Sequence, residues 1–318
     1  MTPTQLRAFS TVVRLGSVKE AAAELGVSEA AVSLHCGQLR KEFNDQLFTR
    51  TGSGLAFTPG GLRLASRAME MLGLQERTIR EVSQAGAGKR LMRVAASSLF
   101  AEHAASGLIE LFASRASDLD VELSVFNTRA FEHLLTTRAV DVAIGPKPKQ
   151  LPETLTSKPF MNYQIVIVCG PGHPLANAQT RPSQLREQTW LLGPSAAGDD
   201  NVVRSMLRRF DVPDDRQRIF QSHAAALEET QRNSGICLAL SFAVADAVGG
   251  GSLVRISGPG VSGDGMWSAM TLPDHTVLPA AAELTRFITT PRAIQAMMRG
   301  SGINIGRFRP SVYVTLWS

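Results

Sequence analysis

Short hydroxyl residues, a glycine and a histidine follow several predicted strands between residues 90 and 230, and their chemistry suits the binding of a small anion. In an open parallel sheet, ligands bind beyond the carboxyl ends of the strands, where the first amides of a helix donate to anions. A hydroxyl at a helix start is also a common N-cap, so a purely structural role stays open. The candidate ligand-binding residues are Ser97, Ser98, Thr128, Arg129, Gly145, Ser195 and His223.

A second set of candidate residues lies near the N-terminus, where the charge balance favours binding to a polyanion. Residues 1–90 hold 12 Lys and Arg against 8 Asp and Glu, whereas the rest of the chain is almost neutral. Such a mild basic bias is what phosphate attraction requires, although it proves nothing alone. The candidate DNA-contacting residues are Ser28, Glu29, Ala30, Ser33, Leu34, His35 and Arg50.

Spacings typical of enzymes and metal sites are missing from the sequence. The three cysteines form no CxxC pair, the six histidines share no HxxxH spacing, and residues 260–264 lack the last glycine of a nucleophile elbow. We therefore expect no enzyme activity, no cofactor and no metal. A redox pair of Cys169 and Cys237 stays a minor alternative, because distance in sequence does not exclude proximity in the fold. His173, followed by proline, is expected to be a turn residue.

Capping signals predict three short helices in the first 45 residues. Thr2-Pro3-Thr4-Gln5 and Ser17-Val18-Lys19-Glu20 are typical of capping boxes, and Ser28 can cap a third helix. Val32, Cys36, Leu39 and Phe43 then form one apolar stripe. Ala22 permits close helix packing and Gly26 suits the turn, so helices two and three predict a helix-turn-helix. An alanine-rich helical hairpin is the structural alternative.

Two glycine-turned strands and a long helix follow. Residues 46–57 predict a wing that directs Arg50 at the DNA backbone, and Thr58-Pro59 restarts a helix. Its apolar residues at heptad a and d positions predict a dimerising seam; these are Leu62, Ala65, Met69, Leu72 and Ile79. Packing of this helix on its own domain is the alternative. Ala85-Gly86-Ala87-Gly88 then reads as a hinge.

Beyond the hinge, apolar strand patterns alternate with helical ones, which predicts a parallel α/β sheet. The first unit takes strands at 91–96, 121–126 and 140–145, and the second takes strands at 164–169, 189–193, 218–221 and 236–240. Helices are predicted at 199–210 and from Ala224, and residues 266–272 return to the first unit. The fold expected is therefore two α/β lobes joined by two crossing strands.

Several motifs together resemble the LysR-type transcriptional regulators. Ala22, Gly26, Val27-Ser28, Ser33, Leu47-Phe48-x-Arg50 and Phe57-Thr58-Pro59-x-Gly61 resemble the family's winged helix-turn-helix, and Asp141-Val142-Ala143-Ile144 and Val168-x4-His173-Pro174-Leu175-Ala176 its effector domain. The resemblance implies double-stranded DNA as a partner, a periplasmic-binding-protein-like body and a homotetramer. Glu29-Ala30 and Leu34 depart from the family pattern, so Glu29 pairing with cytosine and Leu34 touching a thymine methyl compete with plain surface roles.

Length and composition complete the expectation. At 318 residues with 44% apolar residues, the chain predicts two or three folded domains, and it shows neither a membrane span nor a secretory segment. We expect a winged helix-turn-helix at 1–60, a linker helix and hinge at 61–88, an effector domain at 89–300 and a tail at 301–318. Lobe I takes 89–162 and 270–300, and lobe II takes 163–269. The expected function is that of a cytoplasmic, effector-modulated DNA-binding regulator. The alternative is a small-molecule-binding protein or an enzyme on the same two-lobed body. In that case its activity would survive removal of residues 1–60.

Overall fold

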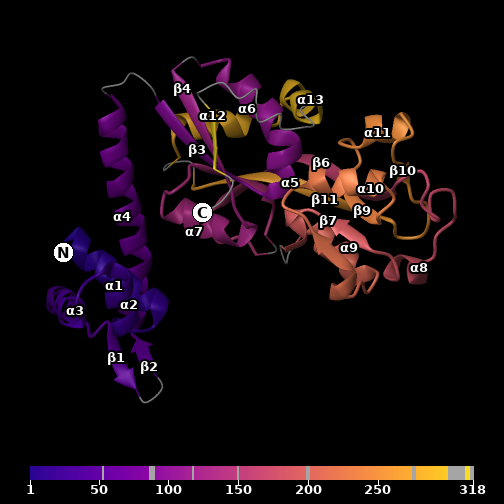
Figure 1. Cartoon of the computed structure of the whole chain (residues 1–318). Coiled ribbons are helices and arrows are strands. Elements are labelled where there is room, and N and C mark those ends of the chain that lie inside the picture. The colour runs from indigo at the N-terminus through magenta and orange to yellow at the C-terminus, as the bar shows by residue number, and fades with distance from the viewer. Residues whose placement is uncertain are drawn as a thin grey trace. The chain divides into compact units, whose positions relative to one another are not determined.

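The protein is described by a computed structural model that places residues 1–51, 54–85, 90–116, 118–148, 150–197, 201–273, 277–299 and 312–315. The chain divides into two compact units, one formed by residues 1–87 with 136–139 and the other by residues 88–135 and 140–318. The predicted hinge at Gly86–Gly88 and most of the 301–318 tail lie outside the described residues. Figure 1 shows the elements of both units in chain order.

The first unit contains the predicted helix-turn-helix and wing. Its elements are α1 (Pro3–Leu15), α2 (Val18–Leu25), α3 (Glu29–Phe43), β1 (Phe48–Thr51), β2 (Gly54–Phe57) and α4 (Pro59–Ala85). The Thr2–Gln5 capping box opens α1, and Ser17 and Ser28 cap α2 and α3 as predicted. Gly16 and Gly26 end the first two helices with φ of 67° and 66°, a conformation that glycine adopts without strain.

The core of this unit confirms most of the predicted α3 stripe. Val32, Cys36 and Leu39 are buried beside Phe9 and Val12 of α1. Phe43 was expected on the same stripe but is exposed. It is the last residue of α3, and Asn44 already adopts the left-handed conformation that ends the helix.

The heptad seam predicted along α4 is wrong as a single face. Ala65 is buried in the core of the first unit and Leu72 packs against it, whereas Leu62 and Ile79 are 53% and 61% exposed. The first half of α4 therefore packs on its own unit, which was the alternative interpretation. The exposed apolar residues of its second half are Met71, Leu74, Ile79 and Val82.

The second unit is built on one ten-stranded mixed sheet. Its strands are β3 (Arg90–Ala96), β4 (Leu119–Val125), β5 (Val142–Pro146), β6 (Thr156–Cys169), β7 (Trp190–Leu192), β8 (Gln217–Ile219), β9 (Ile236–Leu240), β10 (Val254–Arg255), β11 (Ser262–Thr271) and β12 (Val312–Thr315). The order is β12-β4-β3-β5-β11-β6-β9-β7-β8, and β10 also pairs with β6.

Parallel pairing is confined to the two ends of this sheet. β4, β3 and β5 are parallel in the first lobe, and β8, β7 and β9 are parallel in the second. β6 and β11 run antiparallel to each other and to their neighbours β9 and β5. The predicted pair of α/β lobes joined by two crossing strands is thus confirmed, with β6 and β11 crossing between the lobes in opposite directions. The strand predicted at 164–169 as part of the second lobe is the end of β6, and it is antiparallel to β9.

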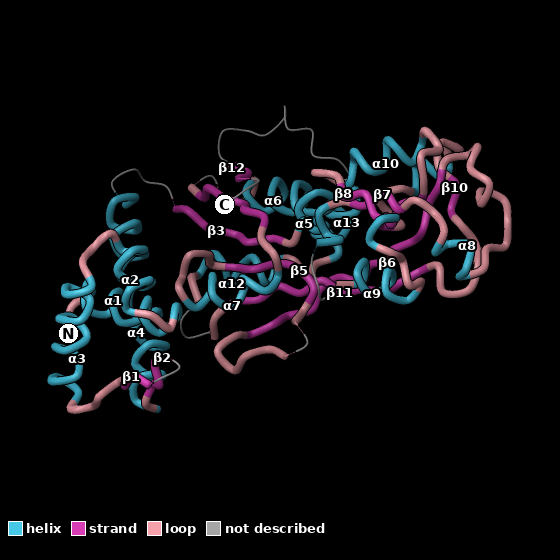
Figure 2. The backbone as a smooth tube through the Cα atoms, turned by 60° about the horizontal axis from the view of Figure 1, so that its bottom comes forward, coloured by secondary structure: helices cyan, strands magenta, loops and turns pink. Residues whose placement is uncertain are grey.

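Helices cover both faces of the sheet, as Figure 2 shows. They are α5 (Ser98–Phe100), the π-helical turn η1 (Ala101–Ala105), α6 (Ser106–Ala113), η2 (Thr128–Ala130), α7 (Phe131–Thr136), α8 (Pro182–Arg186), η3 (Pro194–Ala197), α9 (Val202–Arg209), η4 (Asp214–Arg216), α10 (His223–Gln231), α11 (Ala245–Gly249), α12 (Pro279–Phe287) and α13 (Pro291–Arg299). Leu108 of α6 and Leu284 of α12 join one core with Val94, while Leu135 of α7 joins another with Ala95. Neighbouring residues of β3 thus pack on opposite faces.

Candidate functional site

The turn between α2 and α3 leaves one side of α3 open to solvent. Ala22 is buried, and the Val27 amide donates to the Ala22 carbonyl oxygen over 3.0 Å. Val32 faces the core with no exposed surface. This packing fixes the orientation of α3 about its own axis, so the opposite face of the helix is available to a partner.

The exposed face of α3 carries most of the residues predicted to contact DNA. Glu29, Ala30 and Ser33 are exposed and Leu34 is 60% exposed. Ser28 has a structural role as well, because its hydroxyl accepts a hydrogen bond from the Ala31 amide. These residues occupy the first half of the helix, where recognition helices contact base edges.

His35 lies differently from the other predicted DNA contacts. It is half-buried, and its Nδ1 atom is enclosed without a hydrogen-bond partner. Its ring therefore belongs partly to the interior of the first unit rather than wholly to the exposed face of α3.

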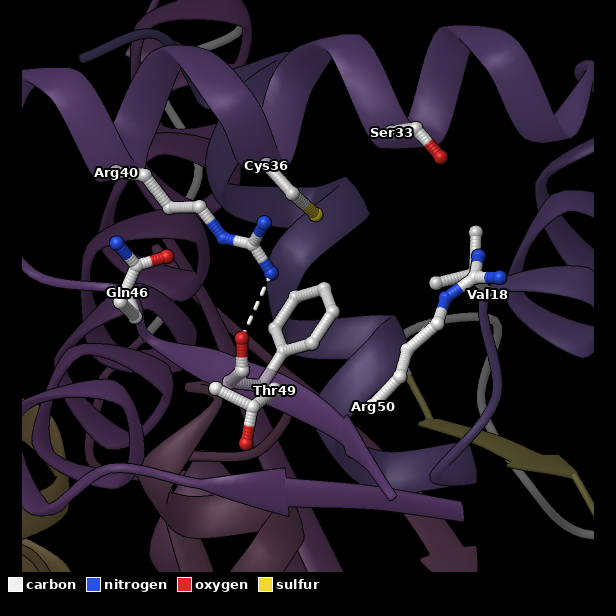
Figure 3. Close-up of a pocket in the computed structure, with 8 residues that line it drawn as sticks. Val18, Ser33, Cys36, Arg40, Gln46, Thr49 and Arg50 are labelled. Atoms are coloured by element: carbon white, nitrogen blue, oxygen red, sulfur yellow. Dashed lines mark hydrogen bonds between the residues drawn. The ribbon is translucent and has the colours of Figure 1, made fainter. Parts of the chain in front are cut away.

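A pocket of about 270 Å³ lies between α3 and the wing (Figure 3). Two arginines line it in different ways. Arg40 donates to the Phe48 carbonyl oxygen over 2.8 Å, and its guanidinium carbon lies 4.3 Å from the centre of the Phe48 ring. Arg50 is exposed, and Figure 3 shows its side chain extending from β1 toward the helix that carries Ser33. The remaining lining residues are Val18, Ser33, Cys36, Gln46 and Thr49.

In the second unit, the carboxyl ends of β3, β4 and β5 lie side by side. The Ser97 amide donates to Ile144 at the end of β5, and the Phe126 amide donates to Ala96 at the end of β3. A methyl group on Gly145 would lie 3.2 Å from the Ser97 hydroxyl, so these two residues are neighbours. The Ser97 hydroxyl is buried without a hydrogen-bond partner in the described part of the chain.

The helix starts at this edge differ from the expectation in one respect. Ser98 and Thr128 are each the first residue of a helical turn, as predicted. The capping positions, however, belong to Ser97 and Asn127, and the Asn127 side chain accepts from the Arg129 amide over 3.0 Å. Asparagine is among the best N-cap residues, so Asn127 rather than Thr128 caps this helical turn.

Ser195 and His223 meet in the second lobe, and His223 also contacts a residue that the sequence did not single out. The Ser195 hydroxyl lies 2.7 Å from His223 Nε2, and His223 Nδ1 is hydrogen-bonded to the Glu102 carboxylate. The His223 amide also donates to both Glu102 oxygens, over 2.9 and 3.0 Å. His103 packs edge-on against the His223 ring, with centroids 5.5 Å apart. Glu102 and His103 thus link the first lobe to the second.

Burial controls the electrostatics of these histidines. It lowers the pKa of both His103 and His223 to about 4, because the charged imidazolium loses its hydration. Both rings are neutral at neutral pH. Serine, histidine and carboxylate follow the order of a hydrolytic triad, yet a base with this pKa is a weak proton acceptor near pH 7.

The Ser195–His223 pair and the residues at the strand ends are connected through two neighbouring helical segments. α5, which begins at Ser98, packs against η3, which carries Ser195. The structure thus brings Ser97 and Gly145 together, and Ser195 and His223 together. Glu102 and His103 were missed; their only signal is a polar pair inside an alanine-rich helical run.

The redox alternative for Cys169 and Cys237 meets a geometric obstacle. They lie on neighbouring strands, but Cys169 is paired with Ile236 and Cys237 with Val168. Side chains of directly paired residues share a face, so the two thiols, offset by one residue, point to opposite faces. Burial also raises their pKa values, to about 11 and about 12. His173 is a turn residue as predicted, since its Nδ1 atom accepts from the Leu175 amide.

Comparison with known protein families identifies a family model for each of the two units. Residues 3–62 match the model of bacterial regulatory helix-turn-helix proteins of the lysR family, and residues 85–291 match the LysR substrate binding domain. The chain belongs to the LysR family. It is a DNA-binding transcriptional regulator with an effector-binding domain. Among the described residues, no helix is long and apolar enough to cross a membrane.

Relatives and solved structures agree with this assignment. An uncharacterized HTH-type transcriptional regulator of Mycobacterium tuberculosis is 57% identical over 100% of both chains. The RuBisCO operon transcriptional regulator of Allochromatium vinosum is 30% identical, over 65% of this chain and 67% of its own. A Corynebacterium glutamicum OxyR C206 mutant has a similar fold, with a TM-score of 0.54 and 19% identity over 94% of this chain and 95% of that one.

Proposed function

We propose that the first half of α3 reads base pairs in the major groove of double-stranded DNA. The observation that carries this proposal is the exposed face formed by Glu29, Ala30, Ser33 and Leu34 on a helix whose other face is locked into the core. In this role Ser33 donates to or accepts from a base edge, Leu34 packs on a thymine methyl, and Glu29 accepts from a cytosine amino group.

Arg50 contributes in a different way. An exposed guanidinium at the wing is suited to a backbone phosphate, which supplies affinity and orientation but no base identity. The two kinds of contact can be told apart, because only a base contact changes which sequences are preferred.

Selection of bound sequences from a random DNA library tests this proposal. The wild-type protein, Ser33→Ala and Arg50→Ala are each used to enrich sites. We expect Ser33→Ala to relax or change the preferred base at one or two positions of the site, and Arg50→Ala to enrich the wild-type site with weaker binding throughout. An unchanged preference in Ser33→Ala would place base recognition elsewhere.

For the second unit, we propose that a small anionic effector binds at the carboxyl ends of β3, β4 and β5. The buried, unpaired hydroxyl of Ser97 supports this, because such a group costs free energy until a partner satisfies it. Ser98, Thr128 and Gly145 belong to the same edge, and Arg129 supplies positive charge there. Ser195 and His223 border this edge through α5 and η3.

We further infer a homo-oligomer, with a dimer formed through the exposed apolar residues of α4 and a tetramer formed as a dimer of dimers. Met71, Leu74, Ile79 and Val82 of α4 are exposed large apolar side chains, which are suited to an interface. Effector binding would then shift the arrangement of protomers rather than change individual base contacts. The compartment proposed for this regulator is the cytoplasm, where its DNA lies.

A further inference from the structure

Three side chains of metal-ligating type from both lobes converge on one point of the second unit. Glu102 and His103 lie on η1 of the first lobe, and His223 begins α10 of the second lobe. Their donor atoms all lie within 4.8 Å of one another. The cluster is largely buried: His103 and His223 are 9% and 3% exposed, which separates it from the acidic groups that are common on surfaces.

His103 points to a missing ligand. Its ring makes an edge contact with His223, and no hydrogen bond to it is found among the described residues. His103 is only 9% exposed, so its imidazole has little access to water. An ion among the three donors would satisfy it.

The local backbone supports the same arrangement. η1 is a π-helical turn, a rare conformation that is frequently found at functional sites. A π-turn has more residues per turn than an α-helix, so consecutive side chains are separated by a smaller angle. Glu102 and His103 can therefore both face His223.

The surroundings of His223 fix its ring. A methyl group on Gly193 would lie 2.3 Å from His223 Cδ2, so only glycine permits this position of the imidazole. On the far side, Ser195 Oγ lies 2.7 Å from Nε2. A metal-bound histidine usually donates its other N–H to such an oxygen, which orients the ring and strengthens the metal bond.

We propose that Glu102, His103 and His223 bind a divalent first-row transition ion, such as Zn²⁺, which bridges the two lobes. Two imidazoles and one carboxylate form a common zinc ligand set, whereas Mg²⁺ and Ca²⁺ prefer oxygen ligands alone. His223 binds the ion through Nδ1, and its Nε2–H then donates to Ser195. Both rings are neutral at neutral pH, as coordination requires. This site goes beyond the effector proposed above and reverses our expectation of no metal from histidine spacing.

Titration of the full-length, chelator-treated and tag-free protein with Co²⁺ tests this site. Co²⁺ replaces Zn²⁺ in such sites, and its visible absorption reports low coordination numbers. We expect one Co²⁺ per chain, displaced by Zn²⁺ and not by Mg²⁺. Glu102→Gln, His103→Gln and His223→Gln should each weaken binding at least about tenfold, since even loss of an outer-shell partner costs 10–100-fold. Ser195→Ala, which removes that partner, should weaken binding by about tenfold.

The matched control is His133→Gln, which removes an exposed imidazole of α7 and should leave Co²⁺ affinity unchanged. Circular dichroism identifies variants that fold, and the wild-type stoichiometry is informative without any variant. Folded wild-type protein that takes up no Co²⁺ would overturn the proposal, as would binding that all three ligand variants retain. The titration contains no DNA, so its failure would leave the DNA-reading proposal intact.

Discussion

Arg40 and Arg50 line the same pocket, and the structure predicts opposite consequences of replacing them with alanine. Arg50 is exposed and belongs to the wing, so we assign it one backbone phosphate. One such contact contributes about 0.9 to the slope of log affinity against log salt. Between about 50 and 200 mM salt, that slope corresponds to roughly a 3.5-fold change in affinity per contact.

Arg40 has a structural role instead. It donates to the Phe48 carbonyl oxygen and stacks on the Phe48 ring. A hydrogen bond from a charged group contributes about 1.5–3 kcal/mol to stability, and the ring contact adds about 0.5–1 kcal/mol. Arg40→Ala should therefore lower the free energy of unfolding by about 2–4 kcal/mol. Arg50→Ala should leave it within about 0.5 kcal/mol, as for most surface substitutions.

Two measurements on the full-length protein separate these effects. Fluorescence anisotropy with one operator and one unrelated duplex gives affinity at four or more salt concentrations, and urea unfolding gives stability. For Arg50→Ala we expect the salt slope to fall by about 0.9 on both duplexes. A slope equal to that of the wild type, or a loss confined to the operator, would refute the phosphate assignment. Equal stability of Arg40→Ala and wild type would refute the structural role of Arg40.

The remaining predictions test the wing, helix α4 and the effector site proposed in the second unit. Asp45 accepts from the Leu47 amide and the Thr58 hydroxyl over 2.6 and 2.8 Å, which lowers its pKa below the usual 3.8. Asp45→Ala should lower the urea midpoint at pH 7, and the difference from wild type should shrink as the pH falls from 3.8 through the lowered pKa of the folded protein. An unchanged midpoint at pH 7 would contradict it. Leu74→Glu should dissociate the α4 dimer in sedimentation without unfolding the chain, because the new charge becomes buried only between protomers; a dimer of unchanged strength would exclude this surface. Thr128→Val should cost about 1–3 kcal/mol of effector affinity in calorimetry and spare effector-free DNA binding, and equal affinities would place the effector elsewhere.

Local signals in the sequence predicted local structure well. The Thr2, Ser17 and Ser28 caps and the Gly26 turn appear as expected, because each depends on contacts within four residues. The same holds for His173, whose turn is closed by the amide two residues later.

Features that depend on distant neighbours were missed or misplaced. The heptad pattern of α4 could not show that Ala65 faces its own unit, because the core that buries it comes from other helices. Glu102 and His223 are 121 positions apart, so no spacing rule connects them. The crossing strands β6 and β11 were expected as shorter segments, since the first half of each strand mixes exposed and buried residues.

The contacts between the lobes constrain how a ligand can act on this regulator. Glu102 binds the His223 amide and ring across the lobes, so these contacts stabilise the arrangement of the lobes that the structure shows. A ligand changes that arrangement only by as much as its affinity for the two arrangements differs. An ion held by Glu102, His103 and His223 draws its ligands from both lobes, and it therefore favours the arrangement in which they meet. An anion held only by the strand ends of the first lobe has no such preference until it also contacts η3 of the second. For an effector bound at the proposed strand-end site, contacts with Ser195 or His223 would couple its binding to a change in the lobes.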